Sequence, residues 1–434
     1  MNIIEHKGIG DAADISDDAA FQAQIAYLLT NSEFYRGRLN DAGITHASQI
    51  GGLSDLATLP FTEKNDLRAS RTDERPLGTQ LACAESDIAR IYSTSGTTGT
   101  PSFIPLTARD VQDWVTISSR SYSASGVSAG DRVISSYNAG PFVAGAALGS
   151  FDRLGLCHIP VGTGNTERLV TAIQKLRADA VVVTPSYALH LIEWAAERGI
   201  DLAQSSVQRV MVAGEPGGGE PEMRATLEAG WGAKVTEAMG IGDIAVSLWG
   251  ECEHQKGMHF GGAGFVHVEL IDPDSGATLP MEDGAEGELV YTHLRQQAAP
   301  LLRFRSRDHV RVTTSPCPCG RHNLRVRCIG RTDDMLIVRG VNVFPTAIRE
   351  VVSDFTPDVS GVILITPTSD GAKQEPPLPV KVEMAPGKAA SDDLAKRIEA
   401  ALRAKLVFRA AIELVPHGSL PRSQYKSKLI QRAT

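Results

Sequence analysis

The spacing of apolar residues changes along the chain and predicts different kinds of structure in succession. Residues 17–40 carry apolar positions at helical spacing until the pattern breaks near Gly51, so the fold is predicted to begin with a helical cap. Between about residues 130 and 240, short apolar runs such as 179–185 and 207–215 alternate with helix-like stretches. This alternation predicts a parallel sheet with crossover helices.

The spacing of apolar residues changes in the second half of the chain. Polar and apolar positions alternate by two in segments 264–273 and 301–312, which predicts antiparallel sheet or a distorted barrel. After about residue 333, a compact series of strand-like and helix-like stretches predicts a small α+β domain. We therefore expect an α/β protein with a large domain at 1–332 and a small, mobile domain at 333–434.

Length and composition fit this organisation. The chain of 434 residues exceeds what one hydrophobic core usually organises, and its 42% apolar and 22% charged residues are ordinary for a globular protein. The formal charge is -8 without a dense basic run, which argues against nucleic-acid binding. The sequence contains neither a stretch long enough for a membrane span nor the plan of a signal peptide. We expect a cytoplasmic protein that does not bind membranes.

Residues 92–107 have the composition of a phosphate-binding loop. Glycines let a backbone approach phosphate closely, while hydroxyl and main-chain N–H groups donate to its oxygens. The segment does not fit the Walker pattern, because Thr100 stands where a lysine would follow the second glycine. A surface loop rich in Ser, Thr and Gly is the plain alternative. The candidate phosphate ligands are Ser93, Thr94, Ser95, Gly96, Thr97, Thr98 and Gly99.

The segment STSGTTGTP within this stretch resembles the phosphate loop of the AMP-forming adenylating enzymes, the superfamily of acyl-CoA synthetases, adenylation domains and luciferases. In that family the loop holds the β- and γ-phosphates of ATP. The family loop often carries a lysine where Thr100 stands, so the positive charge must come from elsewhere. Further segments resemble the family's motifs in the same order: 212–219 on the adenine side, 237–252 for the acyl substrate and magnesium, 301–310 for ribose, 330–345 at the hinge and 420–428 for a C-terminal lysine.

The resemblance implies a set of nucleotide-binding residues. Asp308 can accept hydrogen bonds from both ribose hydroxyls, although a surface ion pair with a neighbouring arginine is the alternative. Arg331 is similar to the family arginine that contacts the nucleotide, and Asp333 occupies the hinge position between the domains. The implied adenine-side residues are Gly214, Glu215, Pro216, Met239 and Gly240.

Two catalytic residues are implied, Asp243 and Lys426. Asp243 stands where the family has a magnesium-binding glutamate, but it is shorter and follows Gly242 instead of a hydroxyl residue, so an aspartate capping a loop is the alternative. Met239 replaces the family tyrosine beside adenine. Lys426 resembles the lysine that bridges the substrate carboxylate and the α-phosphate of ATP. Lys428 is a competing assignment, and a solvated basic tail is the plain alternative.

Cysteines narrow the resemblance to the phenylacetate-CoA ligases. Six cysteines are too few for a disulfide scaffold, and the close pair Cys317 and Cys319 suits metal binding better than a bridge. The resemblance implies that Cys252 and His259 complete a closed structural Zn²⁺ site. His254 is the rival imidazole, and reduced free thiols are the alternative to any metal.

The same resemblance suggests where the acid and coenzyme A bind. Tyr137 and Phe142 stand among small residues, as in a flat apolar slot, although aromatic core packing is nearly as good an explanation. The opposite wall would come from Gly240, Ile241 and Ile244, and the pantetheine path from Arg339, Gly340 and Val341.

We therefore expect an acid–thiol ligase that uses ATP and Mg²⁺ to convert an aromatic carboxylate into an acyl-adenylate and then into its CoA thioester. Phenylacetate, indoleacetate and benzoate-type acids all remain open as substrates. A stand-alone adenylating enzyme that passes the acyl group to a carrier-protein thiol or an amine is the second hypothesis. A nucleotide-binding regulator without activity is the third. A homodimer is the default expectation for a protein of this kind.

Overall fold

The computed structural model describes residues 16–93, 102–137, 143–162, 164–339, 341–369, 371–421 and 429–431. The predicted helical cap at 17–40 is two helices, α1 (Asp17–Asn31) and α2 (Glu33–Asp41). They are separated at Ser32, whose backbone is extended and whose hydroxyl accepts the N–H of Tyr35 to cap α2. A third helix, α3 (Lys64–Ala69), completes this N-terminal part.

Twelve of the described strands form one large sheet, and the strands that come first in the sequence are parallel. The order is β11-β10-β12-β13-β14-β9-β8-β7-β6-β5-β3-β4. The parallel strands are β3 (Arg132–Ser135), β4 (Cys157–Pro160), β5 (Ala180–Val183), β6 (Arg209–Ala213) and β7 (Lys234–Ile241). The crossover helices are α6 (Thr166–Leu176), α7 (Pro185–Ala196) and α8 (Pro221–Trp231). The predicted alternation of strands and helices is confirmed.

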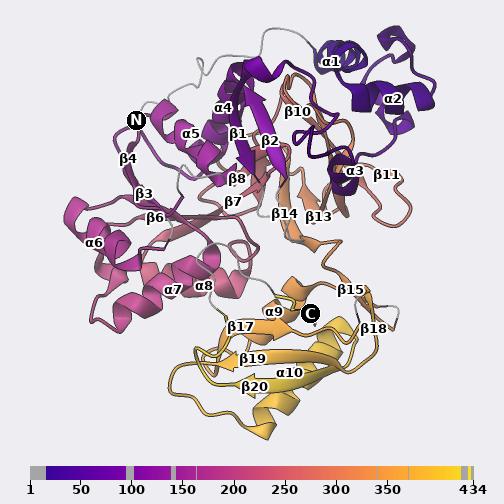
Figure 1. Cartoon of the computed structure of the whole chain (residues 1–434). Coiled ribbons are helices and arrows are strands. Elements are labelled where there is room, and N and C mark those ends of the chain that lie inside the picture. The colour runs from indigo at the N-terminus through magenta and orange to yellow at the C-terminus, as the bar shows by residue number, and fades with distance from the viewer. Residues whose placement is uncertain are drawn as a thin grey trace.

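Both faces of the parallel strands are covered. On β5, Val182 packs into a core that includes Trp114 and Phe151, whereas Val181 and Val183 pack into a second core formed with α6, α7 and α8. Figure 1 shows these three helices together on one side of the strands. The other side carries α5 (Leu148–Arg153) and α4 (Ala108–Ala124), which follows the antiparallel pair of β1 (Ile88–Ser93) and β2 (Phe103–Thr107). Burial on both faces is why these strands read as continuous apolar runs.

The antiparallel strands extend the same sheet. They are β8 (Ala245–Glu251), β9 (Met258–Phe260), β10 (Val266–Ile271), β11 (Thr278–Leu279), β12 (Glu286–His293), β13 (Phe304–Thr313) and β14 (Arg325–Arg331). Of the two architectures expected here, antiparallel sheet is confirmed and a barrel is wrong, because the end strands β11 and β4 do not pair in the described part of the chain. A tight turn reverses the chain from β7 into β8, so the antiparallel strands add to the open edge of the parallel half.

The C-terminal part has its own core. Its elements are β15 (Leu336–Val338), β16 (Val341–Val343), α9 (Pro345–Ser353), β17 (Val359–Ile365), β18 (Lys373–Gln374), β19 (Leu378–Met384), α10 (Asp392–Leu406) and β20 (Ala410–Val415). Ile348, Val380 and Ile398 are fully buried together in a cluster that starts at Leu336. The predicted small α+β unit is confirmed, and Figure 1 shows it set below the large sheet. Among the described helices, none has the length and apolarity needed to cross a membrane.

The remaining short elements connect these layers. They are β1 (Ile88–Ser93), β2 (Phe103–Thr107) and the 3-10 turns η1 (Ala47–Gln49), η2 (Leu53–Thr58), η3 (Glu85–Asp87), η4 (Val143–Ala147) and η5 (Leu202–Gln204).

Candidate active site

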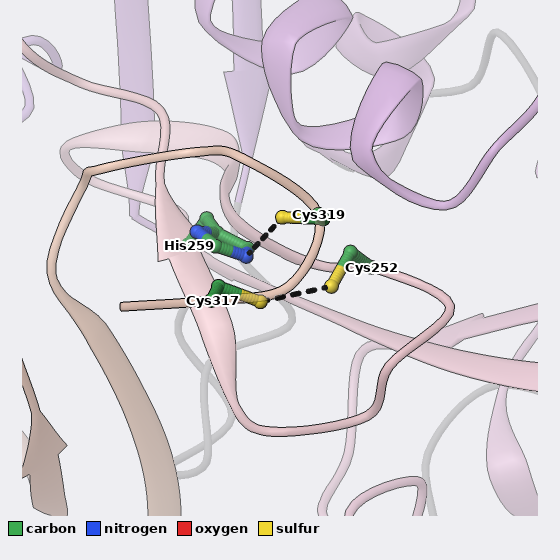
Figure 2. A group of neighbouring side chains, drawn as sticks. All are labelled: Cys252, His259, Cys317 and Cys319. Atoms are coloured by element: carbon green, nitrogen blue, oxygen red, sulfur yellow. Dashed lines mark hydrogen bonds between the residues drawn. The ribbon is translucent and has the colours of Figure 1, made fainter. Parts of the chain in front are cut away.

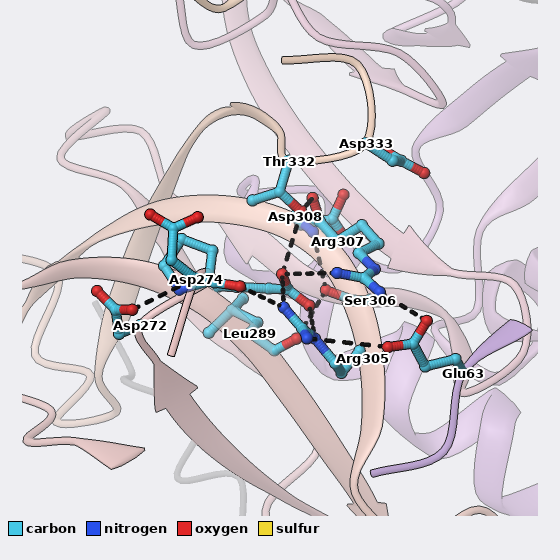
Figure 3. A network of polar contacts seen from close by, with 12 residues as sticks. Glu63, Asp272, Asp274, Leu289, Arg305, Ser306, Arg307, Asp308, Thr332 and Asp333 are labelled. Carbon is cyan, nitrogen blue, oxygen red and sulfur yellow. Dashed lines mark hydrogen bonds and ion pairs between the residues drawn. The ribbon is translucent and has the colours of Figure 1, made fainter. Parts of the chain in front are cut away.

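The register of β13 and β14 brings two predicted nucleotide-binding residues together, beside the predicted hinge residue. Asp308 and Arg331 lie opposite each other across this antiparallel pair, and Arg331 Nη1 is 3.1 Å from Asp308 Oδ1. The same guanidinium binds both carboxylate oxygens of Asp333, at 2.9 and 2.8 Å. Figure 3 shows Asp308 and Asp333 near the end of this strand pair. The predicted ribose carboxylate is therefore joined to the predicted hinge residue through one arginine.

Ion pairs around a buried glutamate, which sequence reasoning missed, support this end of the strands. Glu288 on β12 is fully buried, and its Oε2 is 2.8 Å from Arg305 Nη2 and 3.7 Å from Arg307 Nη1. It also accepts the hydroxyl of Thr332 at 3.0 Å. Arg307 reaches further, to Glu63 at 2.7 Å, as Figure 3 shows. Through these contacts Thr332, the residue before Asp333, is joined to the large sheet and to the N-terminal helices.

The adenine-side segment 214–219 joins the end of β6 to α8 and is held by hydrogen bonds. Glu215 is buried, and its Oε1 accepts the N–H of Ser186 at 2.7 Å. Gly214 has a φ of 97°, in the region that favours glycine, so the chain can turn sharply after the strand. Glu237 on β7 lies beneath the segment, and burial raises its pKa to about 7. Sequence reasoning gave no role to Glu237.

Asp243 lies in the turn between β7 and β8, and its side chain is 7% exposed. Its Oδ2 is 3.4 Å from Lys64 Nζ, at the start of α3. Lys64 was missed because no motif surrounds it in the sequence. It places a positive charge beside the segment that is predicted to bind magnesium. On β7, Gly240 must be glycine, because a Cβ there would lie 2.5 Å from the N of Ser247.

The apolar residues predicted to line the acyl site share one core. Tyr137, Ile241 and Ile244 belong to the same buried cluster, with exposed fractions of 8%, 8% and 0%. Ile244 is completely buried in this cluster. Met239 is half-buried and packs against this cluster, on the strand position opposite Trp249.

Several predicted residues lie outside the described part of the chain. They are Thr94, Ser95, Gly96, Thr97, Thr98, Gly99, Thr100, Phe142, Gly340, Lys426 and Lys428. At the edges of these segments, Ser93 is buried at the end of β1, and Arg339 has a φ of 49° between β15 and β16. The predictions for the phosphate loop and the C-terminal lysine therefore stay predictions.

The four predicted metal ligands meet in one place, shown in Figure 2. Their sulfur and nitrogen atoms all lie within 4.8 Å of one another, although the residues span 252 to 319. Cys252 Sγ is 3.6 Å from Cys317 Sγ, and Cys319 Sγ is 3.4 Å from His259 Nε2. His254, the rival imidazole, is exposed and lies outside this group.

The donor set fits a tetrahedral metal ion. Two thiolates at about 2.3 Å from a common ion at tetrahedral angles stand about 3.8 Å apart, close to the separation seen here. Burial lowers the pKa of His259 to about 4, with Arg321 and Arg325 acting in the same direction, so the imidazole is neutral as a ligand must be. Three sulfurs and one nitrogen leave no position for a substrate, so the site suits a structural ion.

Comparison with protein families agrees with this geometry. The family model described as "AMP-binding enzyme" matches residues 15–294, and "AMP-binding enzyme C-terminal domain" matches residues 340–432. The chain belongs to the AMP-binding enzyme family, within its phenylacetate-CoA ligase branch.

The curated relatives define that branch. The phenylacetate-coenzyme A ligase of Thermus thermophilus is 34% identical over 92% of this chain and 92% of its own length. The enzyme of the same name from Pseudomonas putida is 36% identical over 74% of this chain and 71% of its own length. The chain is accordingly an AMP-forming acid–thiol ligase.

Solved structures of a related ligase show the same fold in two states. A 2-hydroxyisobutyryl-CoA ligase in its postadenylation state aligns with a TM-score of 0.87 at 27% identity, covering 95% of this chain and 88% of that one. That ligase in its thioesterification state aligns with a TM-score of 0.69 at 28% identity and the same coverage. The arrangement seen here is closer to the postadenylation state.

Proposed function

We propose that this enzyme activates an arylacetate-type acid, such as phenylacetate or indoleacetate, or a benzoate-type acid, and transfers it to coenzyme A. The nucleotide part of the proposal is supported by Arg331, which binds Asp308 at 3.1 Å and Asp333 at 2.9 and 2.8 Å. A ribose-binding carboxylate must stand next to a hinge if both half-reactions are to use one nucleotide site. The aromatic part is supported by the relatives, which are named phenylacetate-coenzyme A ligases.

The proposed reaction has two steps. The acid carboxylate attacks the α-phosphorus of ATP, forming acyl-adenylate and releasing pyrophosphate. The CoA thiolate then attacks the acyl carbon, the bond to the AMP oxygen breaks, and thioester and AMP leave. Asp308 would hold the ribose, segment 214–216 with Met239 and Gly240 would face adenine, and Lys426 would stabilise the charge that develops during adenylation.

Cations would assist the first step. Mg²⁺ would neutralise phosphate charge when bound, with Asp243 as an oxygen ligand. Lys64, which is 3.4 Å from Asp243, would supply the positive charge that the phosphate loop lacks at Thr100. Cys252, His259, Cys317 and Cys319 would hold one structural Zn²⁺. It would fix the loop between β13 and β14, the two strands that carry Asp308 and Arg331.

We place the boundary between the two domains at residues 332 and 333. The core of the small unit starts at Leu336, and Thr332 is anchored to Glu288 of the large sheet. Asp333 would be the pivot, and segment 339–341 would line the CoA path after rotation of the small domain.

A panel of acids tests the function. AMP release would be measured for phenylacetate, indoleacetate, benzoate and 2-hydroxyisobutyrate, with and without CoA. We expect an arylacetate or benzoate to give the highest kcat/KM and CoA to be required for sustained turnover. Preference for 2-hydroxyisobutyrate would refute the aromatic assignment. AMP release that needs a carrier protein or an amine instead of CoA would favour the second hypothesis.

A further inference from the structure

Arg349 joins the small domain to the adenine-side segment of the large domain. It lies on α9 and is 5% exposed. Its Nε and Nη2 bind the two carboxylate oxygens of Glu220, at 3.0 and 2.6 Å. Nη2 also donates to the carbonyl oxygen of Pro216 at 2.9 Å. One buried guanidinium thus makes a bidentate ion pair and a main-chain hydrogen bond across the two domains.

Residues of the large domain also bind this segment. Ser186 N–H donates to Glu215 Oε1 at 2.7 Å, before Pro216. Arg224 Nε donates to Gly218 O at 2.8 Å, after it. Gly217, between them, has a φ of 141°, which few other residues adopt. The small domain therefore holds the carbonyl at the middle of a glycine-rich turn whose two ends are fixed elsewhere.

The charges around Arg349 favour this position. Besides Glu220, the carboxylate of Glu215 attracts its guanidinium. Thr346 Oγ1, one turn earlier on α9, donates to Ile329 O at 2.5 Å, and Phe344 stacks on His309 with ring centroids 5.2 Å apart. These contacts hold α9 against the large domain, and Arg349, in the middle of the helix, faces the adenine-side segment.

We propose that Arg349 is a positioning residue that couples the shape of the adenine-side segment to the orientation of the small domain. The proposal rests on the proposed function, since that function assigns segment 214–216 to adenine and rotation to the small domain. In the orientation seen here, Arg349 fixes Pro216 for adenylation. Rotation carries α9 away as a unit, so the guanidinium leaves Glu220 and Pro216, and the segment loosens its hold on the nucleotide after the acyl-adenylate has formed.

The arrangement seen here is closer to one of the two states of a related ligase. The related 2-hydroxyisobutyryl-CoA ligase aligns with a TM-score of 0.87 in its postadenylation state and 0.69 in its thioesterification state, over the same 95% of this chain. Arg349 is almost fully buried between the two units, where a charge is retained only with well-placed partners.

The test separates the two half-reactions and adds a binding measurement. Arg349→Ala is expected to lower kcat/KM for acyl-adenylate formation by about 10- to 100-fold and to weaken AMP binding, measured calorimetrically, by about 10-fold. Thioester formation from supplied acyl-adenylate and CoA should stay within about 2-fold of wild type. Arg349→Lys keeps the charge but cannot bind both oxygens of Glu220 in the same bidentate geometry, so it should recover only part of the adenylation rate. Glu220→Gln should likewise slow acyl-adenylate formation and spare thioester formation, with a smaller effect than Arg349→Ala.

Arg397→Ala is the matched control, because Arg397 lies on α10 of the same domain and is exposed, with an ion pair 3.9 Å long to Asp393. It should change neither half-reaction. Equal losses in both half-reactions for Arg349→Ala and Arg349→Lys, with AMP affinity unchanged, would overturn the proposal in favour of simple structural support. If Arg349→Ala does not fold, the proposal is tested by whether Arg349→Lys and Glu220→Gln slow acyl-adenylate formation more than thioester formation. If wild type activates no acid, the proposed function fails, and AMP affinity still decides the role of Arg349.

Discussion

Replacing Glu237 by glutamine should change how the stability of the protein depends on pH. Glu237 is half-buried on β7. Burial raises its pKa from 4.5 to about 7, and the carboxylate of Glu251 adds to the increase. Arg224 and the N–H of Gly219 act in the opposite direction without cancelling it. The folded protein therefore keeps a proton that the unfolded chain has already released.

The sign and size of the effect follow from these values. Because the pKa is raised on folding, the contribution to stability is complete below about pH 4.5 and is lost as the pH rises through about 7. The two pKa values differ by about 2.5, and each unit is worth about 1.4 kcal/mol, so the upper bound is about 3 kcal/mol. Solvent screening at a half-buried carboxyl reduces this, and we expect about 1 to 3 kcal/mol.

Glutamine keeps the shape of the side chain and can still accept from Gly219 N–H, but it does not titrate. Relative to wild type, Glu237→Gln should gain about 1 to 3 kcal/mol at about pH 8 and little or nothing at about pH 5. The assay is urea unfolding at several pH values, followed by the fluorescence of Trp231 and Trp249, which are fully buried. Glu282→Gln, at an exposed position, is the control. A stability difference that stays constant from about pH 5 to about pH 8 would show that Glu237 is already ionised in the folded protein.

Three further predictions address the candidate site. Cys317→Ser should lose the zinc that we expect at one ion per chain, and should lower the melting temperature by about 5 °C or more while surviving protein keeps most of its activity; metal analysis that finds no zinc in carefully purified wild type would contradict this. Asp308→Ala should raise the KM for ATP by about 10- to 100-fold, because charge-assisted ribose contacts are lost, and an unchanged ATP dependence in steady-state kinetics would remove Asp308 from the site. Lys426→Ala should slow acyl-adenylate formation by about 100- to 1000-fold and leave thioester formation from supplied acyl-adenylate near the wild-type rate; comparable loss in both steps would show that its role is wrong, and full activity would move the assignment to Lys428.

The sequence by itself determined the elements and the kinds of chemistry. Alternation of apolar runs with helical stretches predicted the parallel strands and their crossover helices, because a strand covered on both faces has to be apolar throughout. The order of the motifs predicted which residues face the nucleotide, and the cysteines indicated a metal-type cluster but left the choice between His254 and His259 open. These are local properties, since each depends on neighbours within a few positions along the chain.

Only the tertiary structure decided how distant residues meet. The pairing of β9 with β14 joins segments far apart in the sequence into one sheet, and this sheet is open and not a barrel because its end strands β11 and β4 do not pair in the described part of the chain. The choice of His259 over His254 depends on which imidazole reaches Cys319 across 60 positions of sequence. Lys64, Glu288 and Arg349 carry no motif, and each gained a role only through a partner brought close by folding. Contacts between residues far apart in sequence are set by strand register and domain packing, which the local pattern of a single chain does not encode.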